Sequence, residues 1–178
     1  MELLQYPNLV IGQFRNFIST TDCNLLIDKI NEFSFLKHES LVGNAESTYD
    51  NPIDCNDQFL KEIASVADIK NQIEQACNQY CEKARIKKVK VVQLWANRQK
   101  QHSFLMPHHH GETSVLSGVI YLNVDKLSSG LKFVPSNNII TPESGTLIIF
   151  PSYAMHGSDR PNLTDERIII SFNTQFTQ

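Results

Sequence analysis

Histidines are the residues of this sequence whose positions best suit chemistry. Three of the six are consecutive, at 108–110, and His156 stands alone after an apolar run and a proline. Alternate side chains of an extended chain point the same way, so His108 and His110 share a face, and Glu112 joins it if the extension continues. A face with two imidazoles can present a pair of metal ligands. The spacing therefore predicts a metal site at this segment.

The run His110-Gly111-Glu112 has the His-x-carboxylate spacing of a facial triad. This ligand set holds non-haem Fe(II) and leaves coordination positions open for oxygen and a co-substrate. Its third ligand comes from far along the chain, where His156 is the candidate. Arg167 follows eleven residues later in a strand-like run, and a guanidinium there could bind the distal carboxylate of a chelating anion. The pattern predicts an iron centre that works with an anionic co-substrate.

The elements that must position these residues change type along the chain. Up to residue 86 the pattern is mostly helical, and residues 19–21 offer N-caps before the first helix. A second helical region is predicted over 58–85. Residues 38–54 are polar and rich in turn formers, which predicts a long loop and a candidate substrate lid.

From Lys87 onward the pattern changes to the period of two that is typical of strands. Strands are expected at 89–97, 115–124, 131–134, 145–150 and 167–176. Short strands separated by turn formers predict a mainly β fold with N-terminal helices, an antiparallel jelly roll whose helices pack on one outer face. We expect one domain over 1–178, with a helical support region in 1–86 and a jelly-roll core in 87–178.

Charge and hydropathy exclude several classes of protein. Lys and Arg total 16 against 19 Asp and Glu, and the pI is near 6.0, which disfavours a nucleic-acid partner. The apolar runs are far shorter than the roughly 20 residues of a membrane helix. The N-terminus does not have the pattern of a secretory signal, so the four cysteines indicate reduced thiols. A soluble cytoplasmic protein is expected.

The stretch Trp95–Asn173 resembles the 2-oxoglutarate- and Fe(II)-dependent oxygenases. The resemblance is carried by three pieces in this order: WANRQKQHSFLMPHHHGETSVLSGVIYLN, SGLKF and TPESGTLIIFPSYAMHGSDRPNLTDERIIISFN. It is closest to a small group from marine bacteria and phages, and the YLN and GTLIIF strands are similar to those of prolyl hydroxylases. The resemblance implies a double-stranded β-helix, the jelly roll that is also found in cupins.

The resemblance also implies functions for single residues. It makes His156 the distal iron ligand and gives Arg167 and Tyr121 as partners of the C5 carboxylate of 2-oxoglutarate. Ser171 lies on the same strand face as Arg167 and is a further candidate for binding the co-substrate.

The other two metal ligands stay open between two sets. Alignment of Pro107-His108 with a similar pair in the family makes His108 the first ligand and puts His110 where other members have a carboxylate. The chemistry of the residues alone favours His110 and Glu112. The ligand set is therefore either His108, His110 and His156, or His110, Glu112 and His156.

By resemblance, the activity expected is that of a dioxygenase that uses Fe(II), 2-oxoglutarate and O2 and releases succinate and CO2. Its substrate would be a peptidyl side chain, an amino acid or a small metabolite, and the similarity to prolyl hydroxylases favours a peptidyl substrate. The alternatives are a three-histidine cupin-type dioxygenase that needs no 2-oxoglutarate, a non-catalytic metal-binding jelly roll, and a structural β protein. The sequence leaves the oligomeric state open, a homodimer included.

Overall fold

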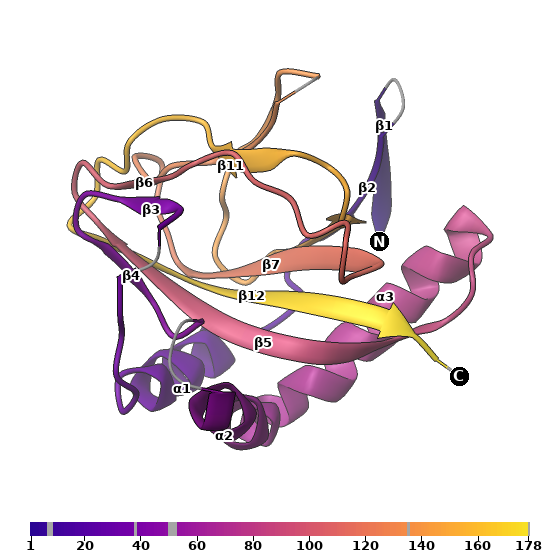
Figure 1. The fold of residues 1–178 in the computed structure, drawn as a ribbon, viewed down its shortest axis with the longest axis horizontal. Helices are drawn as coiled ribbons and strands as arrows, with labels where there is room; N and C mark the ends of the chain where they lie inside the picture. The colour runs from indigo at the N-terminus through magenta and orange to yellow at the C-terminus, as the bar shows by residue number, and fades with distance from the viewer. Residues whose placement is uncertain (7–8, 38, 50–52, 135, 178) are drawn as a thin grey trace.

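A computed structural model describes residues 1–6, 9–37, 39–49, 53–134 and 136–177. These residues form a mainly β molecule, with three α-helices beneath a large sheet (Figure 1). The helices are α1 (Thr20–Ile30), α2 (Ile53–Ala64) and α3 (Ile69–Ala84), and a 3-10 turn, η1 (Val66–Asp68), precedes α3. The sheet-rich fold confirms the expected class. None of the described helices has both the length and the apolar character needed to cross a membrane.

The large sheet contains seven strands in the order β1-β2-β10-β7-β12-β5-β4, and all its pairs are antiparallel. The strands are β1 (Glu2–Tyr6), β2 (Leu9–Phe14), β4 (Ala45–Ser47), β5 (Val89–Lys100), β7 (Leu116–Asn123), β10 (Leu147–Pro151) and β12 (Glu166–Phe176). Apart from β1 and β2, neighbouring strands come from distant parts of the sequence, as in a jelly roll. The C-terminal strand β12 lies between β5 and β7, so it is an interior strand of the sheet.

Smaller sheets lie opposite the large one, across the molecule from the helices (Figure 1). Strands β11 (His156–Ser158), β8 (Leu131–Phe133) and β9 (Asn138–Ile140) form one of them in that order. Strand β3 (Leu41–Val42) pairs with β6 (Phe104–Leu105) in the other. Residues from β7, β8, β10 and β12 form a buried apolar cluster between the large sheet and the three-stranded one.

Alternation along β12 determines which side chains face the interior between the sheets. Ile168 and Ile170 belong to the buried cluster on the helix side, whereas Ile169 belongs to the cluster between the sheets. Full burial of such a side chain contributes roughly 1.5–3 kcal/mol, so this pattern fixes the register of the strand. Arg167 and Ser171 have the same parity as Ile169 and line the cavity between the sheets.

Two features stabilise the helical layer: a capped helix start in α1, and an apolar stripe of α3 that packs on the outer face of the large sheet. Ser19 caps α1, because its Oγ accepts a hydrogen bond from the backbone N–H of Asp22 at 3.1 Å. The stripe of α3 consists of Ile69, Ile73, Cys77 and Tyr80, all buried. The Tyr80 hydroxyl also donates to the carbonyl of Val10 at 2.9 Å, which ties α3 to β2.

Two expectations for the first half of the chain are wrong. Residues 2–6 and 9–14, within the region expected to be mostly helical, form β1 and β2, because these two short apolar runs pair with each other as antiparallel strands. Residues 41–47, expected in a long loop, contain β3 and β4, and β4 pairs with β5. The expected loop also includes residues 38 and 50–52, which lie outside the described residues, and its last residues belong to α2.

Candidate functional site

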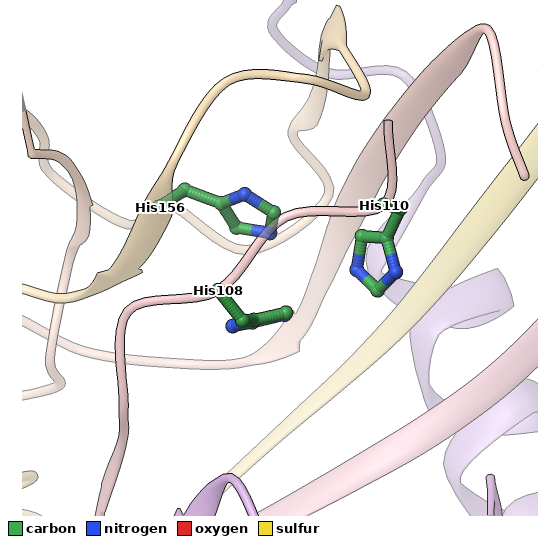
Figure 2. Close-up of side chains that lie close together, drawn as sticks. All are labelled: His108, His110 and His156. Atoms are coloured by element: carbon green, nitrogen blue, oxygen red, sulfur yellow. The ribbon is translucent and has the colours of Figure 1, made fainter. Parts of the chain in front are cut away.

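Three histidines converge at the cavity between the sheets. His108 and His110 lie in the segment between β6 and β7, and His156 is the first residue of β11. The backbones of His108 and His156 exchange two hydrogen bonds, each 2.9 Å from nitrogen to oxygen. One ring nitrogen of each histidine lies within 4.8 Å of the others. The rings are directed toward a common space (Figure 2), which is the arrangement that a bound metal ion needs.

Two of the rings have their proton positions set by backbone carbonyls. Nδ1 of His108 lies 2.9 Å from the carbonyl oxygen of Met106, and Nδ1 of His156 lies 2.8 Å from that of Ala154. A carbonyl oxygen only accepts, so each Nδ1 carries the proton in the neutral ring and Nε2 keeps its lone pair. This arrangement is the usual support of a metal-binding histidine.

The charge state of His156 also suits metal binding. The side chain is buried, and burial lowers the pKa of His156 to about 3, with a further contribution from the nearby His108. Desolvation disfavours the charged form of an imidazole. His156 is therefore neutral at physiological pH and offers a lone pair without first losing a proton.

The position of His110 depends on a close approach between two backbone segments. The backbone N–H of His110 donates to the carbonyl of Ser152 at 2.9 Å. A Cβ on the next residue, Gly111, would lie only 3.0 Å from the Cα of Tyr153. The ring of His110 also lies edge-on to Trp95, with 5.7 Å between the centroids. Glycine at position 111 therefore allows the segment to bring His110 to the cavity.

Glu112 lies outside this group. It is exposed, in a turn where the N–H groups of Thr113 and Ser114 donate to the carbonyl of His110 at 3.2 and 3.1 Å. The turn ends the extended geometry that would have put Glu112 on the face of His110. Within the part of the chain that the structure describes, the group that could hold a metal contains the three histidines and no carboxylate.

The cavity reaches from the histidines to Arg167. About 70 Å³ of it is open to the centres of water molecules, compared with the roughly 10–15 Å³ that one water needs. Trp95, Asn97 and Ser171 line it between the two ends, and Asn97 Nδ2 donates to Ser171 Oγ at 3.3 Å. Among the described lining residues, Arg167 is the only Arg, Lys, Asp or Glu. The cavity therefore combines a possible metal site with one buried cation.

Arg167 and Tyr121 lie together at the inner end. The guanidinium carbon is 5.5 Å from the centroid of the Tyr121 ring. Both residues are buried, and Arg167 Nε, the Tyr121 hydroxyl and Thr146 Oγ1 make no hydrogen bond of normal geometry within the described residues. Burial raises the pKa of Tyr121 to about 12, although the charge of Arg167 opposes the rise. Tyr121 is therefore a neutral donor, and Arg167 keeps its charge despite the lowering of its pKa by burial.

Two further residues contribute to this site, and neither was among the site residues expected from the sequence. Gln99 on β5 is buried, and its Oε1 accepts a hydrogen bond from Nη1 of Arg167. Tyr49 follows β4, lines the cavity, and packs edge-on against Trp95 with 5.0 Å between the centroids. The alternation of β5 puts Gln99 on the same face as Trp95, so the signal for Gln99 was present. Tyr49 has no comparable sequence signal.

The fold is shared with several solved oxygenase structures. The viral collagen prolyl hydroxylase vCPH from Paramecium bursaria Chlorella virus-1, in its 2-oxoglutarate complex, has a TM-score of 0.69 and 18% identity over 94% of this chain and 96% of that one. A prolyl-4-hydroxylase from Pseudomonas putida gives 0.63 and 16%, over 94% and 93%. The non-haem α-ketoglutarate-dependent epimerase SnoN from nogalamycin biosynthesis gives 0.71 and 8%, over 93% and 78%.

No family model and no curated protein matches the sequence. At identities this low, the likeness to the solved structures shows a common fold and nothing beyond it. That fold is the one of the 2-oxoglutarate/Fe(II) oxygenases, prolyl hydroxylases among them, and it confirms the resemblance at the level of structure. The histidine group is present in addition to this fold.

Proposed function

We propose that the protein is a non-haem Fe(II)- and 2-oxoglutarate-dependent oxygenase with His108, His110 and His156 as its metal ligands. One observation carries the proposal: a group of three imidazoles and a buried, incompletely paired arginine line the same cavity. The first can hold a divalent metal, and the second calls for an anion. A keto acid with a second carboxylate can meet both at once.

The donor set fits Fe(II). Imidazole nitrogens are borderline ligands that suit iron, zinc, nickel and copper, and three of them leave coordination positions open for a chelating co-substrate and oxygen. The two Nδ1 contacts to carbonyls leave Nε2 of His108 and His156 to bind the metal. In purified protein the same ligands would also accept zinc, nickel or cobalt.

The inner end of the cavity fits the distal carboxylate of 2-oxoglutarate. A buried cation is strongly disfavoured unless it is paired, and no carboxylate among the described residues lies within ion-pair distance of Arg167. The nearby Asp159 instead accepts a hydrogen bond from the N–H of Gly130 at 2.6 Å. Arg167 would bind the carboxylate, and the neutral Tyr121 hydroxyl would donate a second hydrogen bond to it.

The residues of the chain would position and shield the reaction. When bound, the iron and the keto acid supply the oxidation of a C–H bond by O2, with release of succinate and CO2. The three histidines would hold the metal, and Arg167 would orient the co-substrate. The apolar walls, which include Phe150 and Val119, would exclude water from the site.

The substrate belongs to the same proposal. We favour hydroxylation of a peptidyl side chain over an amino acid or small metabolite, because two of the compared structures are prolyl hydroxylases. Residues 40–49 supply Ser40, Leu41, Ser47 and Tyr49 to the cavity wall, so this segment would act as the lid over the substrate. Tyr49→Ala should spare uncoupled 2-oxoglutarate turnover and reduce oxidation of a proline-rich peptide. Equal loss of both would contradict a lid function.

The central test is an anaerobic titration of the protein with Fe(II), with and without 2-oxoglutarate. We expect the weak visible charge-transfer band of the ternary complex only when both are present. Arg167→Met should weaken 2-oxoglutarate binding by at least about tenfold, because a charged hydrogen bond contributes roughly 1.5–3 kcal/mol. Its affinity for Fe(II) alone should stay near that of the wild type. Unchanged 2-oxoglutarate binding in this variant would refute the co-substrate assignment.

A matched pair of variants tests the ligand set. His110→Ala should lose most of the metal affinity, whereas Glu112→Ala should keep it, because Glu112 lies outside the histidine group. The reverse outcome would establish the carboxylate as a ligand and overturn the three-histidine assignment.

The ligand set of three imidazoles also supports a second candidate function, that of a three-histidine dioxygenase that uses no 2-oxoglutarate. This enzyme would not need a buried arginine in the cavity. The two candidates separate in the same titration: full metal binding without any effect of 2-oxoglutarate on the spectrum would support the second.

A further inference from the structure

The inner face of the large sheet carries a polar row across four neighbouring strands. Thr146 lies just before β10, and its carbonyl accepts a hydrogen bond from the N–H of Tyr121 on β7 at 3.1 Å. Tyr121 pairs with Ile169 of β12, two residues from Arg167. Arg167 is directly opposite Gln99 of β5. The row therefore ends on an amide that contacts the guanidinium.

Both ends of the Gln99 amide have partners. Oε1 accepts from Nη1 of Arg167, and Nε2 donates to Ser158 Oγ at 3.5 Å. Ser158 Oγ also accepts from the N–H of Leu105 at 3.0 Å. The backbone carbonyl of Gln99 accepts from Asn162 Nδ2 at 3.2 Å. These contacts fix the amide so that its oxygen faces Arg167, and Gln99 is only 1% exposed.

A neutral acceptor at this place has a specific electrostatic effect. It satisfies one N–H of the guanidinium and holds the group in position, but it does not cancel the positive charge. A carboxylate in the same place would pair with Arg167 and leave little attraction for an anion from outside. Nε of Arg167 makes no hydrogen bond of normal geometry within the described residues, so the guanidinium would still meet an anion with its charge uncompensated.

We propose that Gln99 is a positioning residue that orients Arg167 for an anionic co-substrate while leaving its charge available. The inference rests on the proposed function, because the anion is the distal carboxylate of 2-oxoglutarate. It adds a residue that acts through the arginine, with which its amide oxygen forms a hydrogen bond.

The test compares two substitutions of Gln99 that separate position from charge. Gln99→Glu keeps the shape and the acceptor oxygen but adds a negative charge, whereas Gln99→Met keeps the length and removes the acceptor. For the Fe(II) protein titrated anaerobically with 2-oxoglutarate, we expect the Kd to rise at least about tenfold in Gln99→Glu and a few-fold in Gln99→Met. Thermal unfolding without ligands should show Gln99→Glu to be at least as stable as Gln99→Met.

Gln93 offers a matched control on the same strand. It has the same parity as Gln99, and its Oε1 accepts from Asn173 Nδ2 at 2.9 Å instead of from an arginine. Gln93→Glu should leave 2-oxoglutarate affinity within about twofold of the wild type. The affinity of all variants for Ni(II) alone, measured by fluorescence of Trp95, should also stay within that range.

The outcomes separate the inference from the proposed function. If the wild type does not bind 2-oxoglutarate, the proposed function falls and the inference with it. If the wild type binds but Gln99→Glu binds as well as the wild type, or better than Gln99→Met, only the inference about Gln99 is overturned. A purely structural residue would give that second result, because glutamate retains the acceptor that Arg167 uses.

Discussion

Substitution of two buried threonines by valine should change the free energy of unfolding in opposite directions. Thr146 Oγ1 has no hydrogen-bond partner among the described residues. Thr174 Oγ1 donates to the carbonyl of Leu116 and accepts from its N–H, both at 3.0 Å. Each threonine is at most 1% exposed. We expect Thr146→Val to stabilise the ligand-free protein and Thr174→Val to destabilise it.

The magnitudes follow from the cost of unpaired buried groups. A buried polar group without a partner costs roughly 1–3 kcal/mol, and valine removes the Thr146 hydroxyl with little change of shape. A gain of about 1 kcal/mol would raise the midpoint of thermal unfolding by roughly 2–4 °C in a domain of this size. Thr174→Val leaves the N–H and C=O of Leu116 without their partner, so a loss of about 1–3 kcal/mol is expected.

Equilibrium unfolding in urea measures both effects. Trp95, the single tryptophan, reports on the core by fluorescence, and circular dichroism provides a second probe. The midpoint should rise for Thr146→Val and fall for Thr174→Val, with the denaturant slope unchanged. A fall for Thr146→Val as large as that for Thr174→Val would mean that the Thr146 hydroxyl is already paired. A rise would identify Thr146 as a donor that remains available to a ligand at the inner end of the cavity.

Three further predictions concern the metal site and the thiols. Ni(II) should quench the fluorescence of Trp95, because its ring lies 5.7 Å from that of His110; absence of quenching in a protein shown to bind nickel would contradict this geometry. Gly157→Ala should weaken Ni(II) binding at least about tenfold, because the added Cβ would lie 2.9 Å from the carbonyl oxygen of Leu105 and displace β11. Calorimetry measures the affinity for Ni(II), and an affinity equal to that of the wild type would refute this prediction. Burial raises the pKa of Cys77, so its thiol should stay protonated and resist modification by a disulfide reagent at pH 8 in the folded protein, as peptide mapping would show.

The large sheet could be predicted from the sequence because its main strands are long enough to show alternation. The period of two located β5, β7, β10 and β12 to within a few residues. The expected strand at 131–134 matches the three-residue β8, whose run is bounded by turn formers. The strands β6, β9 and β11, which are as short, were missed because so few residues cannot show a period. The period of two also missed β1 and β2, whose short apolar runs do not differ from helical spacing until their pairing is known.

The site was partly predictable for a related reason. The consecutive histidines and His156 were visible as residue types, but the choice between His108 and Glu112 depended on whether the chain stays extended after His110. The turn closed by the His110 carbonyl excludes Glu112 from the group, and sequence spacing does not contain that information. The contact of Gln99 with Arg167 likewise depends on the register between two distant strands.

The two ends of the cavity are held by different parts of the fold, and this difference determines how they respond to change. The histidines are held by a connecting segment and a three-residue strand, through the pairing of His108 with His156 and the contact of His110 with Ser152. Arg167 lies on β12, an interior strand of the large sheet that pairs with β5 on one side and with β7 on the other. Sites on connecting segments tolerate variation, whereas sites on interior strands are positioned rigidly. Substitutions around the histidines should therefore alter metal affinity separately from anion binding, and the anion site should keep its geometry when the metal site is rebuilt.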